Sequence, residues 1–156
     1  MRKIILMLSL LLLSSAGNAS MMKFNDQELT LAAKNIVRGK VVKKESFWDK
    51  ERSIIFTRVT LKTNEVLKGA GSEEEVEFVV PGGTVGSLKL WIEDAPELDE
   101  GEEALFFIHK NKYGQNVLVG LKQGKLGLKS NNYNTLDADS NKTMLRIKKI
   151  IKDQQQ

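Results

Sequence analysis

A glycine-rich segment offers the first residues whose types and spacing could do chemistry. Residues 76–87 read VEFVVPGGTVGS, in which alternating apolar residues end in Pro81-Gly82-Gly83. A phosphate-binding loop would run from such a turn into a helix that carries a lysine next to serine or threonine. The following residues, 87–90, alternate like a strand instead. We therefore expect a type II turn, in which Pro81 presets φ and Gly82 accepts a positive φ, with open backbone amides that a partner could use.

Catalytic and metal-binding patterns are weak elsewhere in the chain. His109 is the only histidine, it ends the apolar run ALFFIH, and no nucleophile-elbow pattern surrounds any serine. The chain has no cysteine, and zinc sites usually draw on several histidine or cysteine ligands. The acidic residues 93–103, EDAPELDEGEE, depart from the calcium-loop pattern and are expected to form a solvated loop. We predict a protein that is not an enzyme and binds no cofactor or metal.

Aromatic residues provide candidate contacts with a partner. Phe47 and Trp48 precede the charged residues DKER, and Trp91 follows the glycine-rich segment. Trp48 could be an exposed anchor of the kind that dominates protein interfaces, or it could cap the open end of a barrel. Barrels that bind sugars or single strands stack them on exposed aromatic side chains. The candidate partner-binding residues are Phe47, Trp48, Pro81, Gly82, Gly83 and Trp91.

Caps and periodicity predict the first elements. Asn25 and Glu28 have the spacing of a capping box, which predicts the start of a short helix. A first strand is expected at 36–42, IVRGKVV, where Gly39 suggests a bulge or a close approach. Residues 43–52, KKESFWDKER, are expected to form a polar hairpin connection. The apolar stripe of the helix repeats through Leu29, Ala32, Ala33 and Ile36.

Further strands are expected downstream, separated by turn residues. Residues 53–69 predict a long strand with alternate residues from Ile55 to Leu61 on one face, and its length suits a strand that bends around a barrel. Short strands with regular turns predict a mainly β fold, an antiparallel barrel or sandwich. The third and fourth strands are expected at 76–80 and 84–92, and two or three more within 103–110, 115–121 and 124–129.

The C-terminal residues 140–156 predict a basic amphipathic helix. Met144, Ile147, Ile150 and Ile151 fall on one side, and basic residues occupy most of the rest. We expect this helix to pack on the barrel with its basic face in solvent. Contact of the helix with an anionic membrane surface is the alternative, which the narrow stripe without an aromatic anchor does not favour.

Residues 1–19 have the three-part pattern of a secretory signal peptide. Arg2 and Lys3 precede an aliphatic run of about 10 residues, too short for a membrane span, and small residues mark a cleavage site after Ala19. We expect an exported, periplasmic or extracellular protein with its barrel at 20–139. Its net charge falls from +4 to +2, because Arg2 and Lys3 are the only charged residues of the leader. This small excess argues against nucleic acid as a partner.

The strand segments resemble a group of secreted modules. NIVRGKVV (35–42), a long strand ending in VLKG (66–69) and the later LFFI (105–108) resemble the N-terminal part of tissue inhibitors of metalloproteinases and netrin-like modules. The chain is more similar still to uncharacterised exported bacterial proteins with a VPGGTVGG turn. The resemblance covers about residues 33–110, and it implies an OB-fold-like barrel.

The chain departs from the inhibitor family at its N-terminus. In those inhibitors an N-terminal cysteine, held by disulfides, caps the protease zinc, whereas this chain has no cysteine and an expected mature N-terminus of Ser20-Met21. Zinc capping by that route is not expected, while loop contacts with a protein partner, such as an exported protease, stay open. We predict an exported, non-enzymatic protein-binding module. The alternative is a small ligand- or carbohydrate-binding barrel or a hydrolase.

Overall fold

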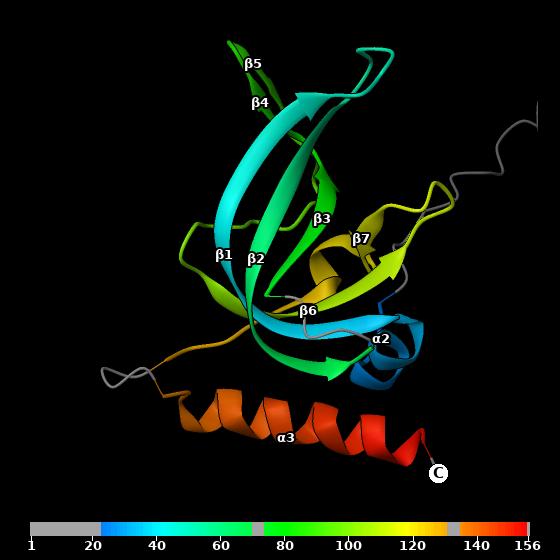
Figure 1. The fold of residues 1–156 in the computed structure, drawn as a ribbon, viewed down its shortest axis with the longest axis vertical. Coiled ribbons are helices and arrows are strands. Elements are labelled where there is room, and N and C mark those ends of the chain that lie inside the picture. The colour runs from blue at the N-terminus through cyan, green and yellow to red at the C-terminus, as the bar shows by residue number, and fades with distance from the viewer. Residues whose placement is uncertain (1–22, 70–73, 131–134, 156) are drawn as a thin grey trace, which may run out of the picture.

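The computed structural model describes residues 23–69, 74–130 and 135–155. The expected signal peptide lies outside these residues. The described part is mainly β, with a short helix before the barrel and a longer helix after it, as the sequence predicts (Figure 1). Its elements in chain order are α2 (Asp26–Ala32), β1 (Asn35–Trp48), β2 (Ile55–Lys68), β3 (Glu75–Pro81), β4 (Gly83–Val85), β5 (Leu88–Leu90), β6 (Glu103–Lys110), β7 (Asn116–Leu118), the 3₁₀ turn η2 (Leu121–Gly124), β8 (Lys125–Gly127) and α3 (Ala138–Asp153).

Five strands close into a barrel. β1 pairs antiparallel with β2, and β2 pairs antiparallel with β3. β3 then pairs parallel with β7, and β6 links β7 back to β1 through antiparallel pairs. The closing pair joins residues 35–40 of β1 to residues 103–108 of β6. This closed ring confirms the predicted OB-fold-like barrel.

The β1–β2 ribbon is long and curved. Register shifts at Arg38/Gly39 and Val41/Lys43 bend it around the barrel (Figure 1). At Gly39 a side chain would press on the carbonyl oxygen of Lys62, so both the bulge and the close approach expected there are confirmed. β1 also continues through residues 43–48, and the turn is confined to residues 49–54. The expected connection over 43–52 is wrong. Residues 43–45 are exposed and residues 46–48 half-buried, so this part of the strand has no buried face and no apolar alternation.

The segment 84–92, expected to be one strand, is a hairpin. β4 and β5 pair with each other around a two-residue turn at Gly86-Ser87, and they form a sheet separate from the barrel. Gly86 takes the positive φ of 61° that such a turn requires. The alternation of apolar residues across this segment is therefore real, but the chain reverses in the middle of it.

Two hydrophobic cores lie on the two faces of β6. Phe106 and Ile108 point into the barrel and pack with Val59 and Phe78 of the opposite strands. Leu105 and Phe107 point outward and pack under the helices. The residues of this second core include Leu29, Ala33, Ile36, Met144, Ile147 and Ile151. The helical stripe predicted for α2 thus lies in one core, although Ile36 belongs to β1 and Ala32 is exposed.

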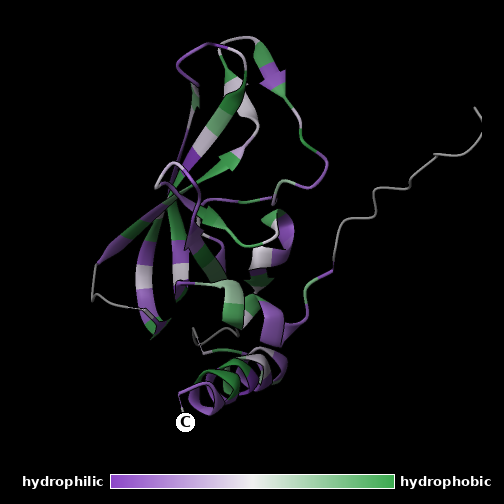
Figure 2. Ribbon diagram, turned by 90° about the vertical axis from the view of Figure 1, so that its right-hand side faces the viewer, coloured by the Kyte–Doolittle hydropathy of each residue, from purple (hydrophilic) through white to green (hydrophobic). Residues whose placement is uncertain are grey.

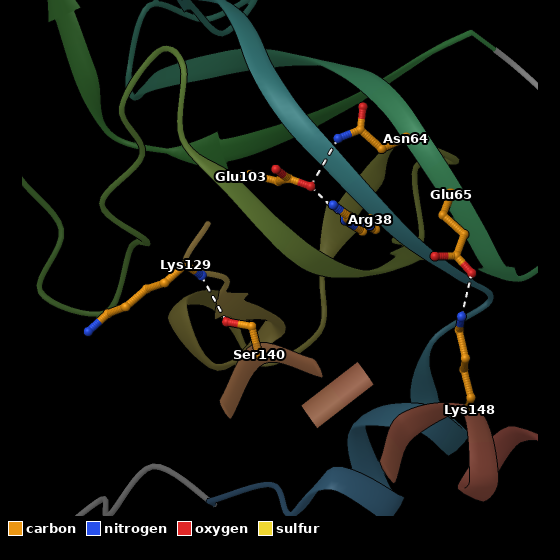
Figure 3. Close-up of polar contacts among 7 residues, drawn as sticks. All are labelled: Arg38, Asn64, Glu65, Glu103, Lys129, Ser140 and Lys148. Atoms are coloured by element: carbon orange, nitrogen blue, oxygen red, sulfur yellow. Dashed lines mark hydrogen bonds and ion pairs between the residues drawn. The ribbon is translucent and has the colours of Figure 1, made fainter. Parts of the chain in front are cut away.

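The C-terminal helix packs against the barrel as predicted, and it begins at Ala138 (Figure 2). Polar contacts hold it at several points along its length. The side-chain oxygen of Ser140 accepts a hydrogen bond from the backbone of Lys129 at 2.8 Å, and Lys148 pairs with Glu65 of β2 at 2.6 Å (Figure 3). Arg146 pairs with Asp26 of α2.

The capping box of α2 is present as predicted, with Asn25 and Glu28 bonding each other's backbone.

Candidate functional site

A cleft of about 440 Å³ opens between the end of the β1–β2 ribbon, the end of β3, the β4–β5 hairpin and the loop that follows. Pro81, Gly82, Gly83 and Trp91, four of the residues predicted to bind a partner, line this cleft together. Its other lining residues include polar side chains from β1, β2, the hairpin and the acidic loop. These are Lys44, Ser46, Thr57, Thr84, Lys89 and Glu97.

A chain of hydrogen bonds fixes one wall of the cleft. Ser46 and Thr57, which face each other across β1 and β2, are joined through their hydroxyls at 2.9 Å. Thr57 also donates to the carbonyl oxygen of Gly82 at 2.8 Å, and the backbone N–H of Thr84 donates to Ser46 at 3.2 Å. The barrel therefore holds the backbone of residues 82–84 directly.

Glycine is required in this wall for two reasons. Gly82 and Gly83 have φ angles of 92° and 137°, which side chains rarely adopt. A side chain at Gly83 would also collide with the hydroxyls of Ser46 and Thr57. The positive φ expected at Gly82 is confirmed, but the expected turn at Pro81-Gly82 is wrong, because Pro81 ends β3 and the chain reverses at Gly86-Ser87 instead. The expectation of open amides is wrong at Gly82 and Thr84, because Gly82 donates to Ile55 at 2.8 Å and Thr84 to Ser46.

Two large apolar side chains are exposed on the hairpin side of the cleft: Trp91 lines it, and Leu88 lies beside the hairpin turn, outside the lining. Trp91 is 70% exposed and Leu88 is 59% exposed, although both are large hydrophobic side chains. Leu88 was not singled out from the sequence, because it reads there as an ordinary strand residue. Leu88 is the first residue of β5, and Trp91 directly follows its last residue. Because β5 pairs with β4, the hydrogen bonds that hold residues 82–84 also help to position both side chains.

The acidic loop over 93–103 is solvated as expected, since Glu93, Glu97, Asp99 and Glu100 are exposed, but three lysines also tie it to the rest of the fold. Lys44 donates to the carbonyl oxygen of Leu98, and Lys125 donates to that of Glu97 and pairs with Glu102 at 2.6 Å. Lys122 pairs with Asp94 at 2.8 Å, and this hydrogen bond raises the pKa of the Lys122 ammonium. These contacts fix the second wall of the cleft. No group of three or more potential metal ligands occurs among the residues that the structure describes.

Phe47 and Trp48 lie outside the cleft lining, near the tip of the β1–β2 ribbon. The Phe47 ring packs beside Phe56 at 6.3 Å and under the guanidinium of Arg58 at 5.1 Å. Trp48 is half-buried and pairs with Ile55 across the strands. The following turn is held by Asp49, whose carboxylate accepts hydrogen bonds from Ser53 and Ile54.

Those hydrogen bonds at the ribbon tip, that of the Ser53 side chain foremost, lower the pKa of Asp49. The carboxylate thus acts as the acceptor that closes this turn.

A second polar cluster lies where β6 closes the ring. Glu103 accepts hydrogen bonds from Arg38 of β1 at 2.6 Å and from Asn64 of β2 at 3.0 Å (Figure 3). These contacts join three neighbouring strands and leave the charges paired, so the cluster serves the barrel closure. His109, on the same strand, pairs with Val117 and is half-buried.

Two comparisons of the sequence with known proteins give no match. A scan against models of protein families finds no match to the chain, and a search of curated proteins finds none either. Within the described residues, no helix combines the length and the apolar character needed to cross a membrane. The physical arguments for function therefore rest on the cleft.

Proposed function

We propose that the protein is an exported, non-enzymatic binding module that holds a protein partner at the cleft beside Trp91. The observation that carries this proposal is the exposure of Trp91 in the cleft and of Leu88 nearby, next to a wall whose backbone at 82–84 is held by hydrogen bonds. Burying such large apolar side chains against a partner contributes most of the energy of many protein interfaces. Because the wall behind them is already fixed by hydrogen bonds, little conformational entropy would be lost on binding.

Export is supported by the leader pattern of residues 1–19. The resemblance to tissue inhibitors of metalloproteinases implies an exported protease as the class of partner. We propose such a protease as the first candidate. The contact would involve the rim of the cleft rather than zinc capping, since the chain has no N-terminal cysteine. Two loops, the ribbon tip with Trp48 and the segment 81–87, remain candidate edges of the same interface.

Affinity capture tests this proposal. The protein is immobilised and incubated with envelope and secreted fractions, and the retained proteins are identified by mass spectrometry. We expect one partner to be retained by the wild type and lost with Trp91→Ala, because the substitution removes the largest exposed side chain of the rim.

Tyr113→Ala is the matched control. Tyr113 is also an exposed aromatic residue, at 74% exposure, but it lies on the β6–β7 turn and does not line the cleft. The partner should be retained by this variant. If all three baits retain the same proteins, the cleft is not the binding site and the proposal is wrong.

A small ligand is the second candidate occupant. The cleft volume of about 440 Å³ falls in the range of small-molecule sites, and Trp91 beside Lys44 and Glu97 combines a stacking surface with polar groups. Sugars or short glycans would fit this chemistry. In a thermal-shift screen of mono- and oligosaccharides, a compound that binds should raise the Tm of the wild type and not that of Trp91→Ala. If no compound shifts the Tm, the second candidate is excluded.

A further inference from the structure

One edge of the β4–β5 hairpin is covered and the other is free. β4 contacts the end of the β1–β2 ribbon, and the N–H of Thr84 donates to Ser46 there. β5 pairs with β4 alone among the strands that the structure describes. An exposed strand edge is a template for an added strand.

The register of the hairpin tells which backbone groups face the free edge. Val85 and Leu88 flank the two-residue turn, so they form a hydrogen-bonded pair, and the next pair, Thr84 and Lys89, is not bonded across the hairpin. The backbone groups of Thr84 therefore point toward β1, which the bond to Ser46 bears out. By the same geometry the N–H and C=O of Lys89 point away from β4, to the free edge.

The side chains around this edge define the chemistry of a strand that would fit. Leu88 and Trp91 offer exposed apolar surface on either side of Lys89. Lys89 is exposed and has no ion pair within the described part of the chain. Opposite charges directly across two strands stabilise the pair, and like charges destabilise it.

We propose that an extended segment of the partner protein adds to β5 as an antiparallel strand, with an acidic residue opposite Lys89 and apolar residues flanking it. This inference rests on the proposed function and states its binding mode. The main chain of the segment would bond to the N–H and C=O of Lys89. An apolar residue one position after the acidic residue would lie opposite Leu88, and one two positions before it would lie next to Trp91.

A second copy of this chain is a less suitable occupant of the edge. Antiparallel pairing of two β5 strands about a twofold axis at Lys89 would place the two lysines opposite each other. Lysine on an exposed edge strand commonly prevents such self-pairing. The charge thus selects an acidic segment from another protein.

Selection from a displayed library of random linear ten-residue peptides tests the binding mode. The immobilised full protein is the bait, and the enriched peptides are then synthesised. We expect them to carry an acidic residue between apolar residues. On binding, the amide of Lys89 should become protected from hydrogen exchange, whereas those of Leu88 and Leu90, bonded within the hairpin, should change little.

Charge reversal provides the variant. Lys89→Glu should lower the affinity for the selected peptides by about tenfold or more. The variant should bind more tightly to versions of the peptides in which the acidic residue is replaced by lysine. Lys112→Glu is the control, because Lys112 is also exposed but lies on the β6–β7 turn. It should leave the affinity unchanged.

The outcomes separate this inference from the proposed function. If no peptide is enriched, or if the enriched peptides bind without protecting the Lys89 amide, strand addition is wrong. The proposed function would still stand if a folded partner is captured by the wild type and lost with Trp91→Ala. If no peptide is enriched and no partner is captured, both the strand addition and the proposed function are wrong.

Discussion

Gly83 is the residue whose lack of a side chain most directly shapes the cleft. It lies where the chain leaves the barrel for the hairpin, against the bonded hydroxyls of Ser46 and Thr57. A neighbouring hairpin residue, Gly86, also has a positive φ, but no atom lies near the position of an added side chain. An added side chain would thus meet both a less accessible φ and a collision at Gly83, but only the cost of the left-handed φ at Gly86.

Gly83→Ala is expected to lower the free energy of unfolding by about 2–4 kcal/mol, because strain and collision add. Gly86→Ala should cost only about 1 kcal/mol, from the backbone alone. Urea unfolding followed by circular dichroism measures both values. Equal costs for the two variants would show that the contact with Ser46 and Thr57 relaxes without penalty.

At the scale of elements, α3 depends on the residue that starts it. Asp137 is the N-cap, and its carboxylate accepts a hydrogen bond from the backbone N–H of Ser140 at 2.8 Å. That bond, the Ser140 side chain and the charge of Lys129 lower the pKa of Asp137. A carboxyl whose pKa is lower in the folded state stabilises the fold above its unfolded pKa, and this stability is lost as the pH falls through the folded value.

Asp137→Asn tests this contribution, because asparagine caps a helix about as well but does not titrate. The Tm of the wild type should fall more than that of the variant between about pH 5 and pH 3, since only the wild type loses a charged cap. Other carboxylates titrate equally in both proteins and cancel in the comparison. Parallel Tm curves would mean that the charge of Asp137 contributes nothing to α3.

At the scale of the whole molecule, the barrel and the β4–β5 hairpin are separate sheets. The ring of β1, β2, β3, β7 and β6 closes without β4 or β5, which form their own sheet. The interior core has its members on the ring strands and the adjoining loop, and none on the hairpin. The molecule should therefore tolerate removal of the hairpin.

Replacing residues 84–89 by two glycines should keep a cooperative thermal transition, with a Tm lowered by a few degrees. Gly83 and Leu90 are paired neighbours, so a two-residue link spans the gap. The same variant should retain no partner in the capture experiment. Aggregation or a non-cooperative transition would show that the hairpin is part of the folding unit.

Local patterns in the sequence were enough to predict most elements. The capping box at Asn25, the alternation in β2 and β3, and the apolar stripe of α3 each depend on residues a few positions apart. The spacing of the apolar residues indicates which side of each element is buried, and it can be recognised without knowing the rest of the fold. The OB-fold-like closure was also expected, through the resemblance of residues 33–110.

The cleft was decided by tertiary structure. The sequence pointed to Pro81, Gly82, Gly83 and Trp91 separately, and it assigned residues 43–48 to a loop because polar half-exposed strands carry no period. Only the pairing of β1 with β2 brings Ser46 beside Thr57, and only the turn at Gly86 leaves the backbone of Lys89 on a free edge. Such contacts join residues far apart in the chain, and they follow from strand register, which no local spacing specifies.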